Sequence, residues 1–235
     1  MSSYWGFFYG AWSWWNLDNM CIVPSKKLLM KFEAGDPRIS ETLDTIAPDN
    51  GNAYRYPPMV FGTDTLKIGF AKYVKRGKEG DVTSSIDNPR ILRYADVLLL
   101  KAEAILKSGG NKADAIALIN QIRERARNSA SPASAVPADR SVSETDESTI
   151  MQWIMDERLL ELCAEEGIRW LDLKRWHAAG YINLANWTAS DNDFSSVRID
   201  FKFSDWYNQT AGKMLFPIPT AEVNANPSIK QNTGY

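Results

Sequence analysis

A regular spacing of apolar side chains on both sides of Gly109-Gly110 constrains the fold of this chain more than any other feature. Before the glycine pair, apolar residues recur every three or four positions, which is the period of one helical face. These residues are Ile91, Tyr94, Ala95, Leu98, Ala102, Ile105 and Leu106. Asn88 is a favoured N-cap, Pro89 suits the first helical position, and the glycines supply a left-handed stop. The pattern predicts a helix from Asn88-Pro89 to about Ser108.

The residues after the glycine pair continue the helical period, and Asn111 can cap a second helix. Its predicted apolar face consists of Ala115, Ile119, Ile122 and Ala126. Its predicted polar remainder includes Arg123, Glu124, Arg125 and Arg127. Two helices joined by so short a turn pack antiparallel, as in TPR-like repeats. One hairpin cannot bury both of its faces, so residues 89–127 need neighbouring helices, and without them an apolar patch is exposed.

Two further helices are predicted after a loop. Residues 128–148 are rich in Ser, Ala, Pro and Asp, which bury too little apolar surface to order tightly, and we expect an exposed loop there. The helical period returns from Glu147 to about Glu165, Gly167 interrupts it, and a shorter helix follows from Ile168 to His177. The third helix carries carboxylates beside apolar groups on one face, namely Ile150, Trp153, Ile154, Glu157, Leu160, Glu161 and Ala164.

The helical period fades after Gly180. Apolar and polar side chains alternate over residues 197–203, which predicts a half-buried strand in a small β-hairpin. Pro217 and Pro219 then force an extended chain, and Thr220 can cap a short turn of helix. The expected fold class is mostly α, with a TPR-like helical hairpin, an irregular loop-rich remainder and the small β-hairpin.

Composition and charge exclude several partners. The 235 residues carry 27 basic and 29 acidic side chains with no long run of either sign, so no electrostatic footprint for nucleic acid is present. No run of about 20 apolar residues occurs, so the sequence predicts no membrane-spanning helix. Cys21 and Cys163 permit one disulfide at most and lack the spacing of metal ligands.

Four motifs occur in order along the chain. They are PSKK at 24–27 with DPR at 36–38, RYADVLLLKAEA at 93–104, ERLLEL at 157–162 with EGIRWLDLKRW at 166–176, and a tail of LFPIP at 215–219, NP at 226–227 and QNTGY at 231–235. Together they resemble the SusD/RagB family of nutrient-binding outer-membrane lipoproteins, whose signature pair of helices the third motif matches. Glu165-Glu166 adds one residue to the family's usual spacing, and we expect a local helix bulge there.

The resemblance implies that residues 1–235 form a SusD/RagB C-terminal domain. Its expected parts are a loop-rich aromatic segment at 1–88, the TPR-like hairpin at 89–127, an exposed loop at 128–148, and the signature helices, small hairpin and C-terminal tail at 149–235. Family members are longer and begin with a lipoprotein signal and an acylated cysteine. Because of that difference in length, we expect the N-terminal half and the lipoprotein signal to be missing here. Asn19-Met20, rather than a basic leader, precedes Cys21, so we do not assign the lipid anchor to Cys21.

The resemblance also implies a function. Family members bind a glycan or similar nutrient at the cell outer membrane and deliver it to a SusC-like TonB-dependent transporter, with starch binding as the best-known case. Such carbohydrate-binding proteins serve nutrient uptake without breaking a bond, so we expect no enzyme, no cofactor and no membrane contact except through a lipid anchor. The alternative is a TPR-type protein-interaction module without sugar binding.

An aromatic cluster near the N-terminus is the predicted ligand-binding site. Its residues are Trp5, Trp12, Trp14 and Trp15, with Asn16 and Asp18 beside them. The C–H groups of a pyranose face pack on aromatic rings, and its hydroxyls need amide or carboxylate partners at the rim. The alternative is that these rings fill the core or cover helices that the chain lacks.

Charged residues of the signature helices offer a second candidate. They are Glu157, Arg158, Glu161, Arg169, Asp172 and Arg175. Glu157 and Glu161 share a helix face and could be the acid–base pair of a glycan-cleaving enzyme, but arginines equal the carboxylates in number. We therefore expect a buried ion network that joins the two helices. His177 is expected at a solvated helix C-terminus without a thiol or acidic neighbour at ligand spacing, which predicts neither a metal site nor a catalytic triad.

Overall fold

The computed structural model describes Pro24 and residues 26–44, 59–61, 64–66, 69–70, 72, 90–165, 167–184 and 215–232. The strand predicted at 197–203 lies outside the described residues, as do Asn88 and Pro89. The described part falls into two compact units, one within residues 1–60 and 65–169 and the other within 61–64 and 170–235.

Helices dominate the described part, which confirms the mostly α fold class. The helices are α2 (Lys26–Lys31), α3 (Arg38–Thr42), α4 (Tyr94–Lys107), α5 (Lys112–Asn128), α6 (Glu147–Leu162), α7 (Ile168–Ala178) and α10 (Thr220–Ala225). The strands are β1 (Leu43–Asp44), β2 (Met59–Phe61), β3 (Asp64–Leu66) and β4 (Gly69–Phe70). β1 and β4 pair antiparallel, with Leu43 opposite Phe70.

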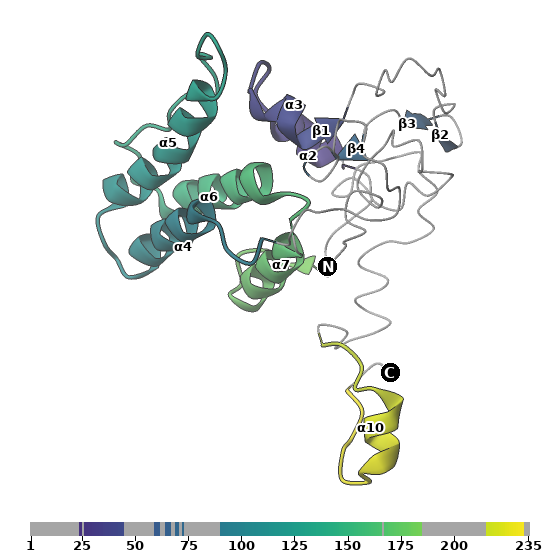
Figure 1. The fold of residues 1–235 in the computed structure, drawn as a ribbon. Coiled ribbons are helices and arrows are strands. Elements are labelled where there is room, and N and C mark those ends of the chain that lie inside the picture. Colours follow the sequence, from purple (N-terminus) through teal and green to yellow (C-terminus); the bar gives the residue numbers. More distant parts are fainter. Residues whose placement is uncertain are drawn as a thin grey trace. The chain divides into compact units, whose positions relative to one another are not determined.

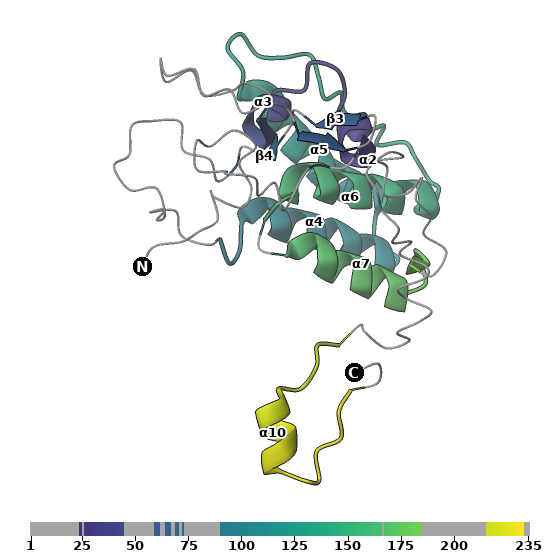
Figure 2. The ribbon, with the colours of Figure 1, turned by 90° about the vertical axis from the view of Figure 1, so that its right-hand side faces the viewer.

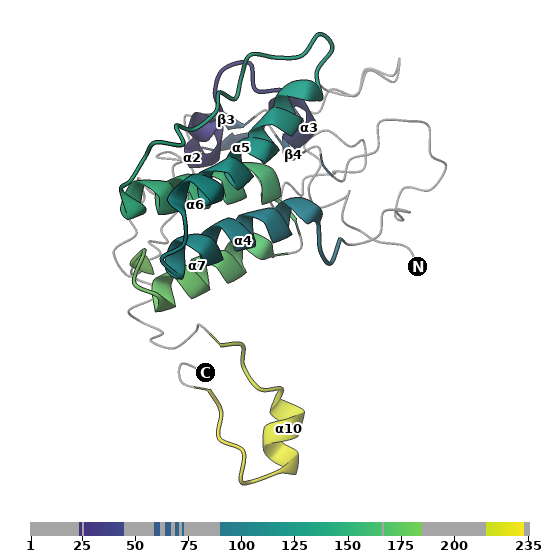
Figure 3. The same cartoon turned by 90° about the vertical axis from the view of Figure 1, so that its left-hand side faces the viewer.

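The predicted helical hairpin is formed by α4 and α5, which run in opposite directions side by side (Figure 3). Gly109 follows α4 with a φ of +71°, the left-handed conformation that was predicted to end the helix. Asn111 caps α5 by accepting a hydrogen bond of 3.1 Å from the Ala113 N–H. The predicted apolar residues of α5 are all buried, so the sequence identified this face correctly: Ala115, Ile119, Ile122 and Ala126.

The start and the exposed face of α4 differ from the prediction. The helix begins at Tyr94, because Arg93 is still extended and directs its guanidinium at carboxylates near the end of α6. The predicted core residues Ile91 and Tyr94 are 93% and 70% exposed. The residues that α4 buries are Ala95, Asp96, Leu98, Leu99, Ala102 and Leu106. Local periodicity therefore located the helix but misjudged which side of its first turn faces the core.

α6 packs on both members of the hairpin (Figure 1). Buried aliphatic side chains of these three helices form the main apolar core. Asp146 caps α6 by accepting a hydrogen bond of 2.8 Å from the Thr149 N–H. Ile150 and Ile154 are fully buried, as are Leu99 on α4 and Ile116 and Ile119 on α5, the two helices against which α6 packs. A buried aliphatic core of this kind supplies the main free energy that holds the helices together.

The end of α6 also differs from the prediction. The helix stops at Leu162 rather than Glu165, so the predicted helix bulge at Glu165-Glu166 falls after the helix, and Glu166 lies outside the described residues. Cys163 is extended, and Ala164 lies in the left-handed region with a φ of 58°. Gly167, at a φ of +76°, precedes α7.

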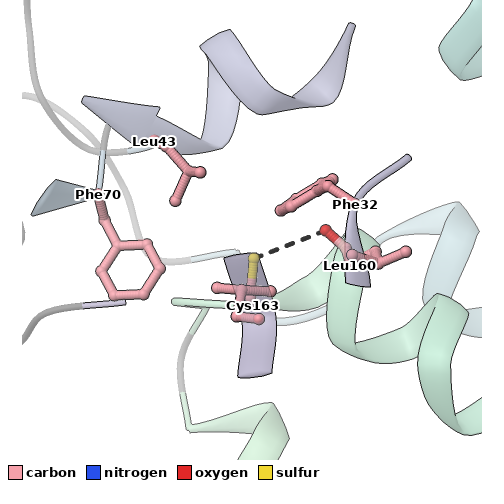
Figure 4. Close-up of a cluster of buried hydrophobic side chains, with 6 residues drawn as sticks. Phe32, Leu43, Phe70, Leu160 and Cys163 are labelled. Carbon is pink, nitrogen blue, oxygen red and sulfur yellow. Dashed lines mark hydrogen bonds between the residues drawn. The ribbon is translucent and has the colours of Figure 1, made fainter. Parts of the chain in front are cut away.

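A smaller apolar cluster lies where α2 meets α6 (Figure 4). The cluster combines side chains from three parts of the chain. They are Leu28 on α2 and Phe32 just after it, Leu43 and Phe70 of the β1–β4 pair, and Leu160 on α6 with Cys163 just after it. The Cys163 thiol is free and lies 3.6 Å from the Leu160 carbonyl oxygen. Burial raises the pKa of this thiol, so it packs as a small apolar group rather than a nucleophile.

The loop between α5 and α6 is mostly exposed, and side chains of α5 hold its backbone. Asn120 exchanges two hydrogen bonds, of 2.7 and 2.8 Å, with the backbone of Arg140. Arg123 and Arg127 donate to the Ala138 and Pro137 carbonyl oxygens. Polar side chains thus order a segment that has little apolar surface to bury.

The second unit contains most of α7, which confirms the short helix predicted to end near His177. His177 is half-buried rather than fully solvated, and its Nδ1 lies 3.4 Å from the Ile182 carbonyl oxygen and 3.4 Å from the Leu184 nitrogen. The tail around α10 closes on itself, because the Gln231 amide pairs with both backbone groups of Ile218 at 2.7 and 2.8 Å (Figure 2). Thr220 does not cap α10 as predicted, because it is the first residue of the helix. Pro219 occupies the N-cap position and makes no side-chain cap hydrogen bond.

None of the helices in the described ranges combines the length and the apolar character needed to cross a bilayer.

Candidate functional site

The predicted ligand-binding residues lie outside the described part of the chain. They are Trp5, Trp12, Trp14, Trp15, Asn16 and Asp18. They remain a prediction. The second candidate, the charged residues of the signature helices, is largely described, and its geometry decides what that set can do.

Glu157 is the centre of a buried ion cluster. Its side chain is 1% exposed, and each carboxylate oxygen receives a guanidinium. Arg38 from α3 donates to Oε1 at 2.6 Å, and Arg123 from α5 donates to Oε2 at 2.9 Å. Arg38 also forms a two-point contact with Asp36, and Arg123 pairs with Glu33. The carboxylate is therefore saturated by positive charge from two helices.

Glu161, one helical turn later, is held by arginines from three elements. Arg93, before α4, donates to Oε1 at 3.0 Å, and Arg125 on α5 lies 2.8 Å from both oxygens. Arg38 on α3 reaches Oε2 at 3.4 Å. The i, i+4 spacing of Glu157 and Glu161 thus places both carboxylates on one face of α6, where Arg38 bridges them.

The last member of the cluster lies just beyond α6. Glu165 is buried, and its carboxylate accepts hydrogen bonds from Lys72 at 2.7 Å and from Arg93 at 2.7 and 3.0 Å. The same two cations donate to the Glu161 backbone carbonyl oxygen, at 2.7 Å from Lys72 and 2.9 Å from Arg93. The carboxylate and the helix-terminal carbonyl are therefore held together by one pair of side chains.

Hydrogen bonds and charge in this cluster raise the pKa values of two arginines. Burial alone would lower the pKa of the Arg38 guanidinium, but its bonds to Asp36 and the charge of Glu157 outweigh burial and raise it. Burial likewise lowers the pKa of Arg93, but the hydrogen bonds and charges of Glu165 and Glu161 together outweigh burial and raise it. Both guanidinium groups are firmly charged, so the cluster holds fixed ion pairs rather than a proton donor.

The expected buried network exists around Glu157 and Glu161. Their described partners include Arg38 on α3, Arg123 and Arg125 on α5, and Arg93, which the prediction did not name. On the second signature helix, α7, buried Asp172 accepts a 2.9 Å bond from its own Arg175. Arg158 is paired across to α4, 2.8 Å from Asp96.

Sequence reasoning overlooked the arginines that complete the cluster, most clearly Arg123. It was placed on the polar side of α5, yet its side chain is 1% exposed. A signal was present, because Arg123 follows Ile119 by four positions and precedes Ala126 by three, which puts it on the apolar face. A charge at such a position predicts a buried ion pair.

The arrangement does not suit acid–base catalysis. Glycoside hydrolysis needs one carboxyl group that keeps a proton and a second that faces the sugar, about 5 to 10 Å apart across a cleft. Here Glu157 and Glu161 are both buried, and each carboxylate is bonded to guanidinium groups. Among the described residues, no group of histidine, cysteine or acidic side chains could hold a metal ion. The cluster joins α6 to α3 and α5 through ion pairs.

Comparisons with known proteins identify the same family as the sequence motifs. The family model described as "SusD family" matches residues 31–235. SusD-like protein P38 of Formosa agariphila is 39% identical over 190 residues, which are 77% of this chain and 31% of that protein. SusD-like protein P2 of the same organism is 28% identical over 221 residues, 91% of this chain and 40% of that protein.

A solved structure shows the same fold. The crystal structure of a SusD homolog from Bacteroides thetaiotaomicron superimposes with a TM-score of 0.60 at 22% identity, and the match covers 86% of this chain and 41% of that one. The chain thus spans less than half the length of each of these relatives. Because the family model covers the signature helices, the hairpin and the tail in one continuous match, the chain belongs to the SusD family.

Proposed function

We propose that this protein captures a glycan or a similar nutrient at the bacterial outer-membrane surface and passes it to a SusC-like TonB-dependent transporter. One observation carries the proposal, which is the family match over residues 31–235. That range contains every charged residue of the described cluster around α6, whose ion pairs join the helices of the matched part. The same family membership supports the proposed surface location.

The proposed role is binding without bond cleavage. The carboxylates that sequence inspection singled out, Glu157 and Glu161, are occupied by arginines. A purified chain that hydrolyses oligosaccharides would contradict this part of the proposal.

We place the ligand at the aromatic cluster of residues 5–18, which lies outside the described residues. The support is chemical: Trp5, Trp12, Trp14 and Trp15 offer flat apolar faces for a sugar ring. Asn16 and Asp18 offer hydrogen-bond partners for its hydroxyls. Starch is one candidate among many glycans, because such platforms accept several pyranoses.

The test is affinity electrophoresis of the purified chain in gels that contain single soluble polysaccharides, followed by Trp→Ala substitutions at positions 5, 12, 14 and 15. We expect one glycan to retard the chain and one substitution to abolish retardation without lowering the melting temperature. Trp153→Phe is the matched control, because Trp153 lies on α6 and its ring centre is 5.3 Å from the Arg140 guanidinium carbon. This substitution should leave retardation unchanged. A folded chain that no glycan retards would refute sugar capture at this cluster.

The alternative function, a TPR-type protein-interaction module, is favoured by a different observation. The first half of α4 and the residues before it expose large apolar side chains that no described element covers, namely Ile91, Leu92, Tyr94, Val97 and Leu100. Such a face binds protein. Val97→Glu should weaken a protein complex through this face while leaving any glycan retardation intact, which separates the two functions.

A further inference from the structure

Arg140, in the loop between α5 and α6, carries a half-buried positive charge that no ion pair offsets in the described part of the chain. Its Nε is buried and has no hydrogen-bond partner. Its two terminal nitrogens likewise donate to no described residue. Taking such a cation partly out of water costs free energy that a bound carboxylate normally offsets. The guanidinium therefore lacks the acceptor that its surroundings call for.

The carboxylates whose charge acts on Arg140 are already bound to other cations. Glu157 receives two guanidinium groups, and Asp156 receives a lysine ammonium at 2.7 Å. Glu33 pairs with Arg123. Burial, and then the like charge of Arg123, lower the pKa of Arg140. The charge of Arg140 is thus a surplus that the ion cluster does not neutralise.

The position of Arg140 is fixed from two sides. The Asn120 side-chain amide exchanges hydrogen bonds of 2.7 and 2.8 Å with the backbone of Arg140. The guanidinium carbon lies over the ring of half-buried Trp153, 5.3 Å from its centre, which is within the range of a cation–π contact. Because backbone and head group are both held, the side chain loses little conformational freedom when it binds an anion.

We propose that Arg140 and Trp153 form a subsite for the carboxylate of an acidic sugar. The inference rests on the proposed function, glycan capture, and adds the charge class of the ligand. A carboxylate is planar, and its two oxygens match two parallel N–H donors of a guanidinium. The indole beside the guanidinium offers apolar surface to the C–H groups of the sugar ring. Binding costs less here than at a fully solvated arginine, because Arg140 is already partly out of water and held in place.

The first test follows the Arg140 Nε–H resonance in heteronuclear NMR spectra of the full chain. This proton is buried, so its exchange with water is slow enough to observe, and its peak is identified by its absence from Arg140→Lys. The probes are galacturonate, galactose and acetate. We expect galacturonate to shift the peak in a saturable way. Galactose and acetate should shift it at least about ten-fold less at the same concentration, because each lacks one half of the ligand.

Substitutions test the same site by calorimetry with galacturonate. Arg140→Gln removes the charge and should weaken binding at least about ten-fold. Lys101→Gln is the matched control, because it makes the same change in net charge at an exposed position on α4, and it should leave binding unchanged. Trp153→Phe keeps an aromatic face for the guanidinium and should also retain binding. Should Arg140→Gln fail to fold, Arg140→Lys keeps the charge but loses the paired donors, and it should still weaken binding.

The proposal is overturned if galacturonate produces no saturable shift of the Arg140 peak in the folded chain. An equal shift with acetate would also overturn it, since a carboxylate alone would then be recognised. An equal shift with galactose would overturn it as well, because the charge would then play no part.

These results are separate from those on glycan capture at the aromatic cluster. A neutral polysaccharide that retards the chain, without a galacturonate shift, would refute the acidic-sugar subsite and leave capture standing. A saturable galacturonate shift in a chain that no neutral polysaccharide retards would support the subsite and refute only capture at the aromatic cluster.

Discussion

The two halves of α6 are buried in opposite ways. The first half packs Ile150, Met151 and Ile154 against aliphatic side chains of α4 and α5. The second half buries Glu157, Arg158 and Glu161, each paired with an opposite charge from another element. Apolar contacts are non-directional and tolerate small changes in shape, whereas a buried ion pair fails when one partner is lost. The comparison therefore predicts where α6 is tolerant and where it is not.

The largest expected effect is at the centre of the ionic half. Glu157→Gln keeps the size of the side chain but leaves Arg38 and Arg123 without their shared carboxylate. We expect the free energy of unfolding to fall by about 3–5 kcal/mol, measured by urea denaturation followed by circular dichroism. Glu147→Gln, at an exposed ion pair at the other end of α6, is the control and should change stability little. A loss below about 1 kcal/mol at Glu157 would show that the two halves are equally tolerant.

The next effect separates the charge from the contact. Arg158→Met leaves Asp96 buried without the guanidinium 2.8 Å away, and we expect a loss of about 3 kcal/mol. The double substitution Asp96→Leu with Arg158→Met removes both charges and should recover most of that loss. Thermal melts of the wild type, both single variants and the double variant form the thermodynamic cycle. Simple additivity in that cycle would mean that the pair is not coupled.

The apolar half should respond more weakly to a matched change. Ile154→Val removes one methylene from a fully buried side chain and leaves a small cavity between the helices. We expect a loss of about 1 kcal/mol by the same denaturation experiment. A loss as large as that of Glu157→Gln would contradict the view that this half tolerates small changes in shape.

The smallest expected effect lies at the start of α6, where a carboxylate acts in solvent. The hydrogen bonds from Thr149 hold the pKa of Asp146 below its usual value of 3.8. A lowered folded-state pKa means that the stabilisation is complete above the unfolded value and is lost as the pH falls below 3.8. Asp146→Asn keeps a cap that does not titrate. As the pH is lowered from neutral to acid, the melting temperature of the wild type should therefore fall more than that of Asp146→Asn. If the two melting temperatures change in parallel with pH, protonation of Asp146 does not affect stability.

The sequence by itself determined the helices, one cap and most of the core. Local period and N-cap chemistry located α4, α5, α6 and α7 and identified Asn111 correctly, because these features depend on residues a few positions apart. The four motifs between residues 24 and 235 also sufficed to identify the family.

Only the tertiary structure decided where α4 begins, where α6 ends and which charges are buried. Arg93 stays extended because it binds Glu161 and Glu165. Lys72 and Arg93 bind the Glu161 carbonyl oxygen, and α6 ends at Leu162, three residues before its predicted end at Glu165. Arg123 looked like surface on α5 and proved to be core, because Glu157 lies opposite it. The physical reason is common to all three: an ion pair between residues 34 to 93 positions apart leaves no trace in local periodicity, yet it outweighs local preference once it is buried.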